Sequence, residues 1–174
     1  MCIQHRVADI PGGGTVSVKE LGGSALFEGT PLGNGSDGVY RVCKTAQILV
    51  AATATATTYE VAKGHHFQAG DRFATANCAG QTIASVDKSH PAKDVITLSA
   101  SLGAAVAADE CAFESCGETT DLKVTPIGFA GSNEDVHQND NLFVSIWVMG
   151  VILEKNAPIV NAAIKAALKC VIYH

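Results

Sequence analysis

Two adjacent histidines, His65 and His66, are the residues of this sequence with the most obvious capacity for chemistry. An imidazole can ligate a metal or act as a general base near neutral pH. In an extended strand, neighbouring side chains point to opposite faces, so the two rings are not expected to share one metal ion. We therefore favour structural hydrogen bonding, near turns at Gly64 and Gly70, over catalysis or metal binding.

Three further polar groups gather at turns. Asp71 follows Gly70, and its carboxylate is expected to accept hydrogen bonds from turn amides. Asp87, Ser89 and His90 have the composition of a catalytic triad, but they lie within one short turn. A working triad also needs a positioned nucleophile, and no G-x-S-x-G motif occurs. No catalytic residue is predicted.

Metal and cofactor motifs are absent from the sequence. The six cysteines contain no C-x-x-C pair, so a zinc site is not expected, and free thiols in a reducing compartment are favoured. The acidic and amide residues on both sides of Val136 lack the spacing of an EF-hand loop. The glycine-rich stretch 29–38 matches neither a P-loop nor a dinucleotide-binding motif. No metal and no cofactor is predicted.

Charge and hydropathy restrict the partners. The net charge is -5 and Lys and Arg form no cluster, which argues against nucleic-acid binding. Only 17% of residues are charged, a composition compatible with a surface that contacts other proteins. The first residues lack the apolar core of a secretory signal, and no apolar run is long enough to span a bilayer. A soluble protein without membrane contact is expected.

The elements that must position these residues are short. Between residues 57 and 113, brief β-branched and apolar runs alternate with turn residues such as Gly64, Gly70, Asp71, Asp87 and Gly103. This pattern is typical of antiparallel hairpins in a sandwich or small barrel. We predict a mainly β fold, a small barrel or sandwich with one short C-terminal helix.

The C-terminal third carries the strongest apolar signals. Residues 142–153 predict a strand buried on both faces and bent at Gly150. Trp147 within it is expected to be a core or interface anchor, although it could instead form a sugar-binding platform. A helix is predicted to open at Asn156 to Pro158, followed by a final strand at 171–173. The expected organisation is a flexible, glycine-rich arm and loop at 1–38 and a β-rich core domain at 39–174.

A set of short motifs, taken in order from about Phe27 to Tyr173, resembles the head fiber proteins of tailed bacteriophages and prophages. They are Gly29–Gly33, Asp37–Tyr40, Lys44–Ala46, Val61–Phe67, Gly70–Asp71, Val86–Ser89, Asp94–Leu98, Leu102–Ala104, Ser145–Val151 and Ala157–Pro158. These motifs are structural turns rather than chemistry.

The resemblance implies a non-enzymatic capsid decoration protein, soluble in the bacterial cytoplasm until it attaches to the outer surface of the viral head. The implied partners are the major capsid protein and further copies of this chain. We expect a homo-oligomer, with a trimer as the favoured state. A carbohydrate-binding β module is the alternative from another class. A small hydrolase that uses His65 or His66 ranks third.

Overall fold

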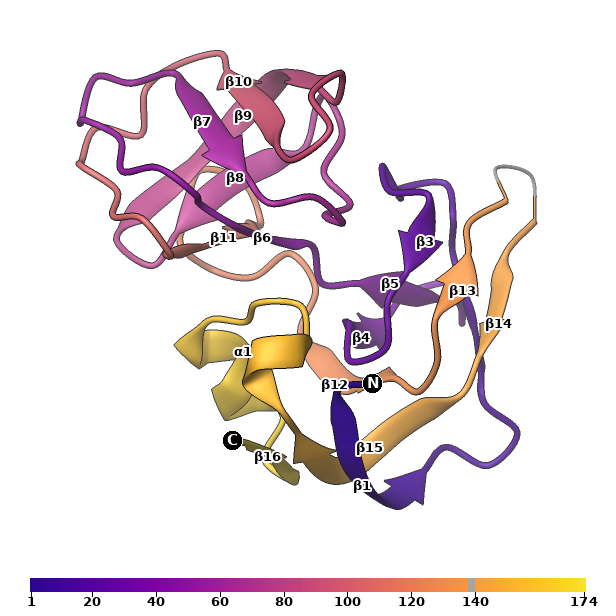
Figure 1. Ribbon diagram of the computed structural model, residues 1–174. Coiled ribbons are helices and arrows are strands. Elements are labelled where there is room, and N and C mark those ends of the chain that lie inside the picture. The colour runs from indigo at the N-terminus through magenta and orange to yellow at the C-terminus, as the bar shows by residue number, and fades with distance from the viewer. Residues whose placement is uncertain (138–139) are drawn as a thin grey trace. The chain divides into compact units, whose positions relative to one another are not determined.

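A computed structural model describes residues 1–137 and 140–174 and divides the chain into two compact units (Figure 1). Unit 1 consists of residues 1–43 and 124–174, and unit 2 consists of residues 44–123. Unit 2 is thus an insertion in the sequence of unit 1. The described chain is mainly β with one short C-terminal helix, which confirms the predicted fold class.

Unit 1 is built around one eight-stranded sheet with the order β1-β15-β12-β4-β5-β2-β14, to which β16 adds beside β15. The pairings are antiparallel except those of β2 with β5 and of β15 with β16. A separate two-stranded sheet joins β3 to β13. The elements of unit 1 are β1 (Ile3–Asp9), β2 (Gly14–Val16), β3 (Ala25–Leu26), β4 (Pro31–Asn34), β5 (Tyr40–Val42), β12 (Pro126–Ala130), β13 (Glu134–Asp135), β14 (Leu142–Val144), β15 (Ile146–Ile152), the 3-10 helix η1 (Glu154–Asn156), α1 (Ala162–Ala167) and β16 (Val171–Tyr173).

Small and branched side chains form the core of unit 1. One cluster combines residues of β2, β3, β4, β5, β12, β14 and β15, and its largest members include Leu26, Leu32 and Ile146. Helix α1 contacts β12 and buries Ile164 completely. Phe129 on β12 is also fully buried, and the remaining free-energy gain comes from many modest aliphatic contacts.

Unit 2 is a six-stranded sheet with the order β6-β11-β8-β9-β10-β7. The segment after β6 meets β7 through an Ile48–Val61 bridge, with Leu49 N donating to Glu60 O at 2.8 Å and Ala62 N to Gln47 O at 2.9 Å. The two ends of the sheet therefore join, and the curled sheet leaves few unpaired backbone groups. The strands are β6 (Thr45–Gln47), β7 (Thr58–Val61), β8 (Arg72–Thr75), β9 (Cys78–Asp87), β10 (Asp94–Leu98) and β11 (Cys111–Glu114).

An aromatic cluster fills the interior of unit 2. Tyr59 and Phe73 have ring centroids 5.3 Å apart, and Phe67 lies 5.5 Å from Phe73. All three side chains are fully buried, together with Ile48, Ile83 and Ile96. Phe67 comes from the loop between β7 and β8, so that loop closes the interior with its own side chain.

The N-terminal 38 residues differ from the predicted flexible arm. They contribute β1 to β4, and β1 pairs with β15 near the other end of the chain. The predicted boundary between residues 38 and 39 falls in the turn between β4 and β5, two paired strands of one sheet. Gly12 and Gly13 adopt positive φ angles of 80° and 68° in a turn before β2, so the glycine run is a turn rather than a linker.

Two C-terminal predictions need correction. The apolar run 142–153 is divided into β14 and β15, and exposed Phe143 and Met149 show that it is not buried on both faces. The helix begins at Ala162 rather than near Pro158, because the Asn161 side chain accepts a hydrogen bond from Ile164 N at 2.8 Å and caps it there. The predicted final strand is present as β16.

Candidate interaction surface and buried charge clusters

The glycines predicted at turns lie at positions that favour glycine. Gly64, Gly70 and Gly103 have φ angles of 90°, 92° and 78°, in the left-handed region. Asp87 ends β9, and its carboxylate accepts a hydrogen bond from Ser89 N at 2.9 Å. That bond holds the pKa of Asp87 below its usual value. The Asp87, Ser89 and His90 group is therefore an exposed turn.

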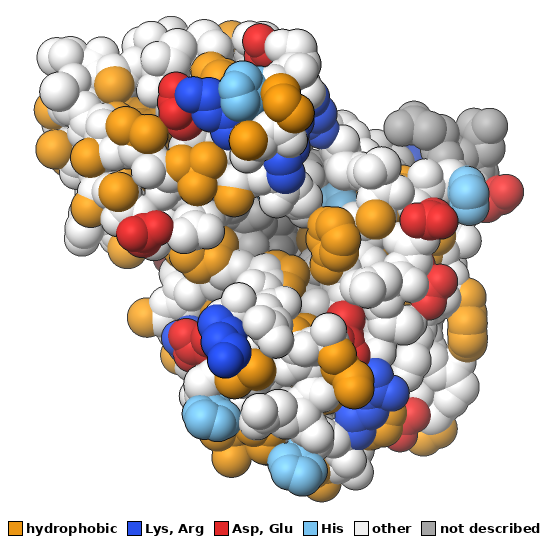
Figure 2. All heavy atoms as spheres, in the orientation of Figure 1, with side chains coloured by type: hydrophobic (Ala, Val, Ile, Leu, Met, Phe, Trp, Pro, Cys, Tyr) orange, Lys and Arg blue, Asp and Glu red, His pale blue; other side chains and the backbone are white. Residues whose placement is uncertain are grey.

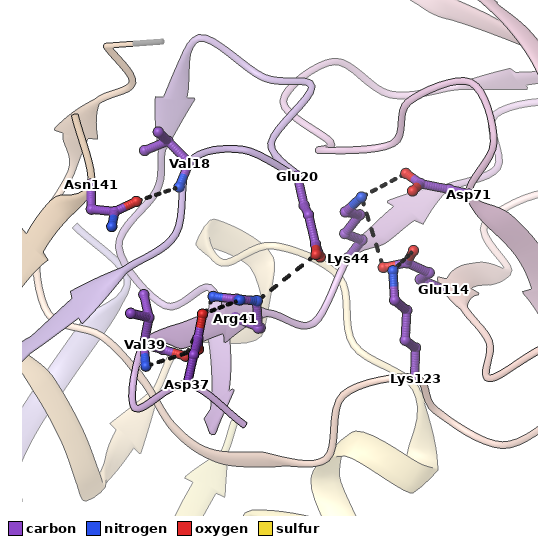
Figure 3. A network of polar contacts seen from close by, with 10 residues as sticks. All are labelled: Val18, Glu20, Asp37, Val39, Arg41, Lys44, Asp71, Glu114, Lys123 and Asn141. Carbon is purple, nitrogen blue, oxygen red and sulfur yellow. Dashed lines mark hydrogen bonds and ion pairs between the residues drawn. The ribbon is translucent and has the colours of Figure 1, made fainter. Parts of the chain in front are cut away.

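A buried charge cluster occupies unit 2. The Lys44 side chain is 1% exposed, and its Nζ lies 2.6 Å from Oδ2 of Asp71 and 3.8 Å from Oε2 of Glu114. Lys123 pairs with the other Glu114 oxygen at 2.8 Å (Figure 3). Asp71 also accepts a hydrogen bond from Gln68 N at 2.7 Å, as a turn carboxylate would. Burial raises the pKa of Glu114, while the two lysines oppose that shift.

The cluster joins the first and last residues of unit 2. Glu114 N donates to Lys44 O at 3.0 Å, and Lys123 N donates to Glu114 O at 3.0 Å. Main-chain and side-chain contacts of one residue, Glu114, therefore hold both ends of the insertion. The sequence did not identify Lys44, Glu114 or Lys123 as site residues. Glu114 follows Lys44 by 70 positions and precedes Lys123 by 9, and no local motif marks either lysine as its partner.

His65 and His66 lie in the loop between β7 and β8, not in a strand, and both are buried. Nδ1 of His65 accepts a hydrogen bond from Phe67 N at 3.1 Å. Nε2 lies 3.1 Å from Oδ2 of Asp94, at an angle outside good hydrogen-bond geometry. Asp94 also pairs with Lys63. Burial lowers the pKa of each imidazole to about 4.

The contact between His65 and Asp94 places an imidazole beside a carboxylate, an arrangement that is also found in the active sites of hydrolases. However, the side chains of His65 and Asp94 are only 1% and 4% exposed. A general base must come within hydrogen-bond reach of its substrate. The arrangement supports a structural role for His65. Among the described residues, no group of three or more His, Cys, Asp or Glu side chains could hold a metal.

Trp147 is a half-buried residue of β15. The guanidinium of Arg6 lies over its ring, with Cζ 5.5 Å from the centroid. Arg6 also donates to Gly131 O at 2.8 Å and pairs with Glu28 at 3.1 Å. A Cβ at Gly131 would come within 2.5 Å of Trp147 Nε1, so glycine is required for this approach. The ring therefore packs against Arg6 and Gly131, as an anchor within unit 1 would.

Glu28 ties the start of β1 to the rest of unit 1. Its carboxylate accepts hydrogen bonds from Cys2 N at 2.7 Å and from Arg6 at 3.1 Å. Burial works against the charged form, but these donors outweigh it and lower the pKa of Glu28. Burial and the neighbouring carboxylate raise the pKa of the Cys2 thiol to about 11. All six cysteines are free thiols. The raised pKa keeps the thiol of Cys2 protonated and therefore unreactive.

Exposed apolar side chains mark the two ends of the sheet in unit 1. Val7 on β1 is 62% exposed and Phe143 on β14 is 69% exposed, and these strands are the terminal members of the sheet. Met149 on β15 and Ile172 on β16 are also exposed. No sequence signal marks the exposure of Phe143 and Met149, because residues 142–153 are apolar at almost every position.

The rest of the visible surface is largely neutral. Figure 2 shows charged side chains singly or in small groups among orange hydrophobic side chains and the white atoms of other side chains and the backbone, in keeping with 17% charged residues. No helix in the described part of the chain is both long and apolar enough to cross a membrane.

No family model, curated protein or solved structure matches this chain. The resemblance to head fiber proteins therefore stays a prediction that depends on the turn motifs.

Proposed function

We propose that this chain is a non-enzymatic head fiber or decoration protein of a phage or prophage. It is soluble in the bacterial cytoplasm before assembly and attaches to the outer surface of the viral head, with the major capsid protein as its partner. Self-association into a homo-oligomer, a trimer in the first instance, accompanies attachment. The turn motifs suggested this role, and the exposed apolar residues on the terminal strands of unit 1 are the observation that carries it.

The distribution of apolar surface supports docking through unit 1. Nine large hydrophobic side chains are exposed among the described residues, and seven of them belong to unit 1. Unit 2 exposes only Leu49 and Val50 in this class. Fully burying one such side chain at an interface is worth about 1.5–3 kcal/mol. A few contacts of this kind from each copy are enough for a specific interface once a multimer forms.

The polar clusters support a role without catalysis. Burial shifts the pKa values of several side chains: it lowers those of His65 and His66 to about 4, and it raises those of Tyr173, Cys2 and Glu114. Perturbed groups in an open cleft would suggest an active site. Here His65 accepts a hydrogen bond from a main-chain amide and Glu114 pairs with two lysines instead.

Oligomerisation fits the mechanism of attachment. Several weak contacts act together when one assembly holds its copies at high effective concentration. Spikes on capsids commonly follow local threefold symmetry, which favours a trimer over the dimer that is commoner among soluble proteins. The unpaired outer edges of β1 and β14 are suitable places for such contacts.

Two measurements test the proposal. Light scattering after size-exclusion chromatography gives the oligomeric state, and co-sedimentation with fiberless heads of the encoding phage gives attachment. We expect a trimer that sediments with heads, and we expect Val7→Ser together with Phe143→Ser to weaken attachment at least tenfold. Val50→Ser is the matched control, because Val50 is 53% exposed in unit 2.

An equal loss of attachment in the control and in the double variant would contradict docking through unit 1. A chain that stays monomeric at high concentration and does not sediment with heads would overturn the proposed function. A gene for a major capsid protein beside the gene for this chain is a further expected observation.

A further inference from the structure

The loop between β7 and β8, residues 62–71, carries both buried histidines and the Phe67 plug of unit 2. Phe67 is 0% exposed and lies 5.5 Å from Phe73, centroid to centroid. The His65 ring lies 5.8 Å from the Phe67 ring. Any change that moves His65 or His66 therefore acts directly on the side chain that closes the aromatic core.

His65 can be accommodated only as a neutral ring. Its Nδ1 accepts the hydrogen bond of Phe67 N at 3.1 Å, so this nitrogen must carry a lone pair and the proton must be on Nε2. Nε2 faces Oδ2 of Asp94 at 3.1 Å. A second proton on Nδ1 would place two N–H groups against each other and break the bond to Phe67.

The charges around the pair do not compensate for protonation. Asp94 is the carboxylate that faces His65, and it is already paired with Lys63 from the loop itself. Lys88, which follows β9, acts unfavourably on both rings, and Lys44, before β6, acts on His66. Lys44 in turn is balanced by Asp71 and Glu114. Each ring, if charged, also repels the other.

We propose that His65 and His66 form an acid-sensitive lock on unit 2. Protonation of the two imidazoles releases the loop 62–71, withdraws Phe67 and exposes the aromatic core, while unit 1 keeps its fold. The other four histidines, His5, His90, His137 and His174, are exposed, so unit 1 contains no buried histidine among its described residues. This inference does not depend on the proposed function.

The direction of the effect follows from proton linkage. The unfolded chain binds a proton on each histidine near pH 6.5, whereas the folded pKa of both is lowered to about 4. The unfolded state therefore holds more protons between these values, and stability falls as pH falls from about 6.5 to about 4. Each ring reduces the folding equilibrium constant of unit 2 by up to about tenfold per pH unit in this window.

The first test is a wild-type titration. Two-dimensional NMR of the full chain from pH 7.5 to 3.5 would follow the six imidazoles and the amides of both units. His65 and His66 should stay neutral until the amides of unit 2 lose their native positions. Unit 1 should retain its native amides at that pH. Titration of both buried rings above pH 6 in a native unit 2, or simultaneous loss of both units, would overturn the proposal.

The second test uses variants that cannot take up a proton. His65→Asn keeps an acceptor near the position of Nδ1, and His66→Gln keeps a polar group near that of Nε2. Together they should lower the acid midpoint of unit 2 by at least one pH unit. His90→Asn is the matched control, because Nδ1 of His90 accepts a hydrogen bond from Ala92 N at 3.1 Å but the ring is exposed.

The control should leave the midpoint unchanged. A folded double variant with the wild-type midpoint would overturn the lock, and so would an equal shift in His90→Asn. Should the double variant not fold at pH 7.5, the wild-type titration decides by itself.

Discussion

Lys44 shows how strongly a single residue can depend on its partners. Its ammonium group is almost completely removed from water and is balanced by Asp71 and Glu114. Removing one member of a buried ion pair leaves an uncompensated charge, which typically costs 3–5 kcal/mol. An exposed pair contributes about 0–1 kcal/mol. Unit 2 contains both a buried and a partly exposed ion pair, so the effect of replacing lysine by methionine can be compared between them.

We expect Lys44→Met to lower the free energy of unfolding of unit 2 by about 3 kcal/mol, since Asp71 then loses its ammonium partner and Glu114 keeps only Lys123. Lys93→Met should change it by less than about 1 kcal/mol, because Lys93 and Glu60 are a partly exposed pair. Urea denaturation followed by the amide signals of unit 2 measures both. Equal effects in the two variants would mean that the buried cluster gives no special stabilisation.

Arg6 offers a residue-scale test in unit 1. Its guanidinium lies over Trp147 and also binds Gly131 O and Glu28. Arg6→Met should move the fluorescence of Trp147, the single Trp of the chain, to longer wavelength, because water gains access to the ring. We expect a loss of about 1 kcal/mol. Arg41→Met removes another paired arginine of unit 1 and should leave the emission unchanged. A shift in both variants would point to a general loosening of unit 1.

At the scale of elements, local sequence determines the turns, whereas residues far along the chain determine strand pairing and the position of the loops. Turn glycines such as Gly64 and Gly70 and the run of short strands between them could be predicted, since turn chemistry acts within a few residues. The loop position of His65 and His66 could not, because the pairing of β7 with β10 and the Phe67 plug depend on residues far along the chain. The same holds for β1, whose partner β15 follows more than 130 residues later.

The start of α1 illustrates a competition between two local rules. Pro158 fits a first helical turn, which places the predicted start near Asn156. In the structure Asn156 ends the 3-10 helix η1 and Asn161 caps α1. A cap satisfies a backbone amide that would otherwise lack a partner, and proline gives no such bond.

Asn161→Ala should therefore destabilise unit 1 by about 1 kcal/mol, the usual effect of losing a side-chain cap. Asn156→Ala is the control at the position that the sequence favours. Its amide only donates to Met1 O at 3.3 Å in an exposed setting, so we expect a change of a few tenths of a kcal/mol. Trp147 fluorescence during urea unfolding reports on unit 1 alone, because that unit holds the single Trp. A larger effect at Asn156 would contradict the structural assignment of the cap.

At the scale of the whole molecule, the insertion of one β unit within the sequence of another could not be predicted from the sequence. No change of composition occurs near residues 43 and 124, and no linker-like stretch separates the units. Each unit has its own core. In unit 2 the sheet is joined at its ends, and Glu114 ties Lys44 to Lys123. In unit 1, Cys43 Sγ lies 3.2 Å from Val124 O, so the two segments of that unit meet where the insertion departs.

These contacts predict that the two units fold separately. Residues 44–123 expressed alone should give the amide spectrum that they have in the full chain, because their core and end contacts are all internal. Unit 1 with residues 43 and 124 joined by a short Gly-Ser linker should keep its Trp147 emission. Glu114→Gln in the isolated unit 2 should destabilise it more than in the full chain, where the flanking chain also restrains the two ends. A poorly dispersed spectrum for 44–123 would show that unit 2 depends on unit 1, and would also remove the basis for unfolding one unit by acid while the other stays native.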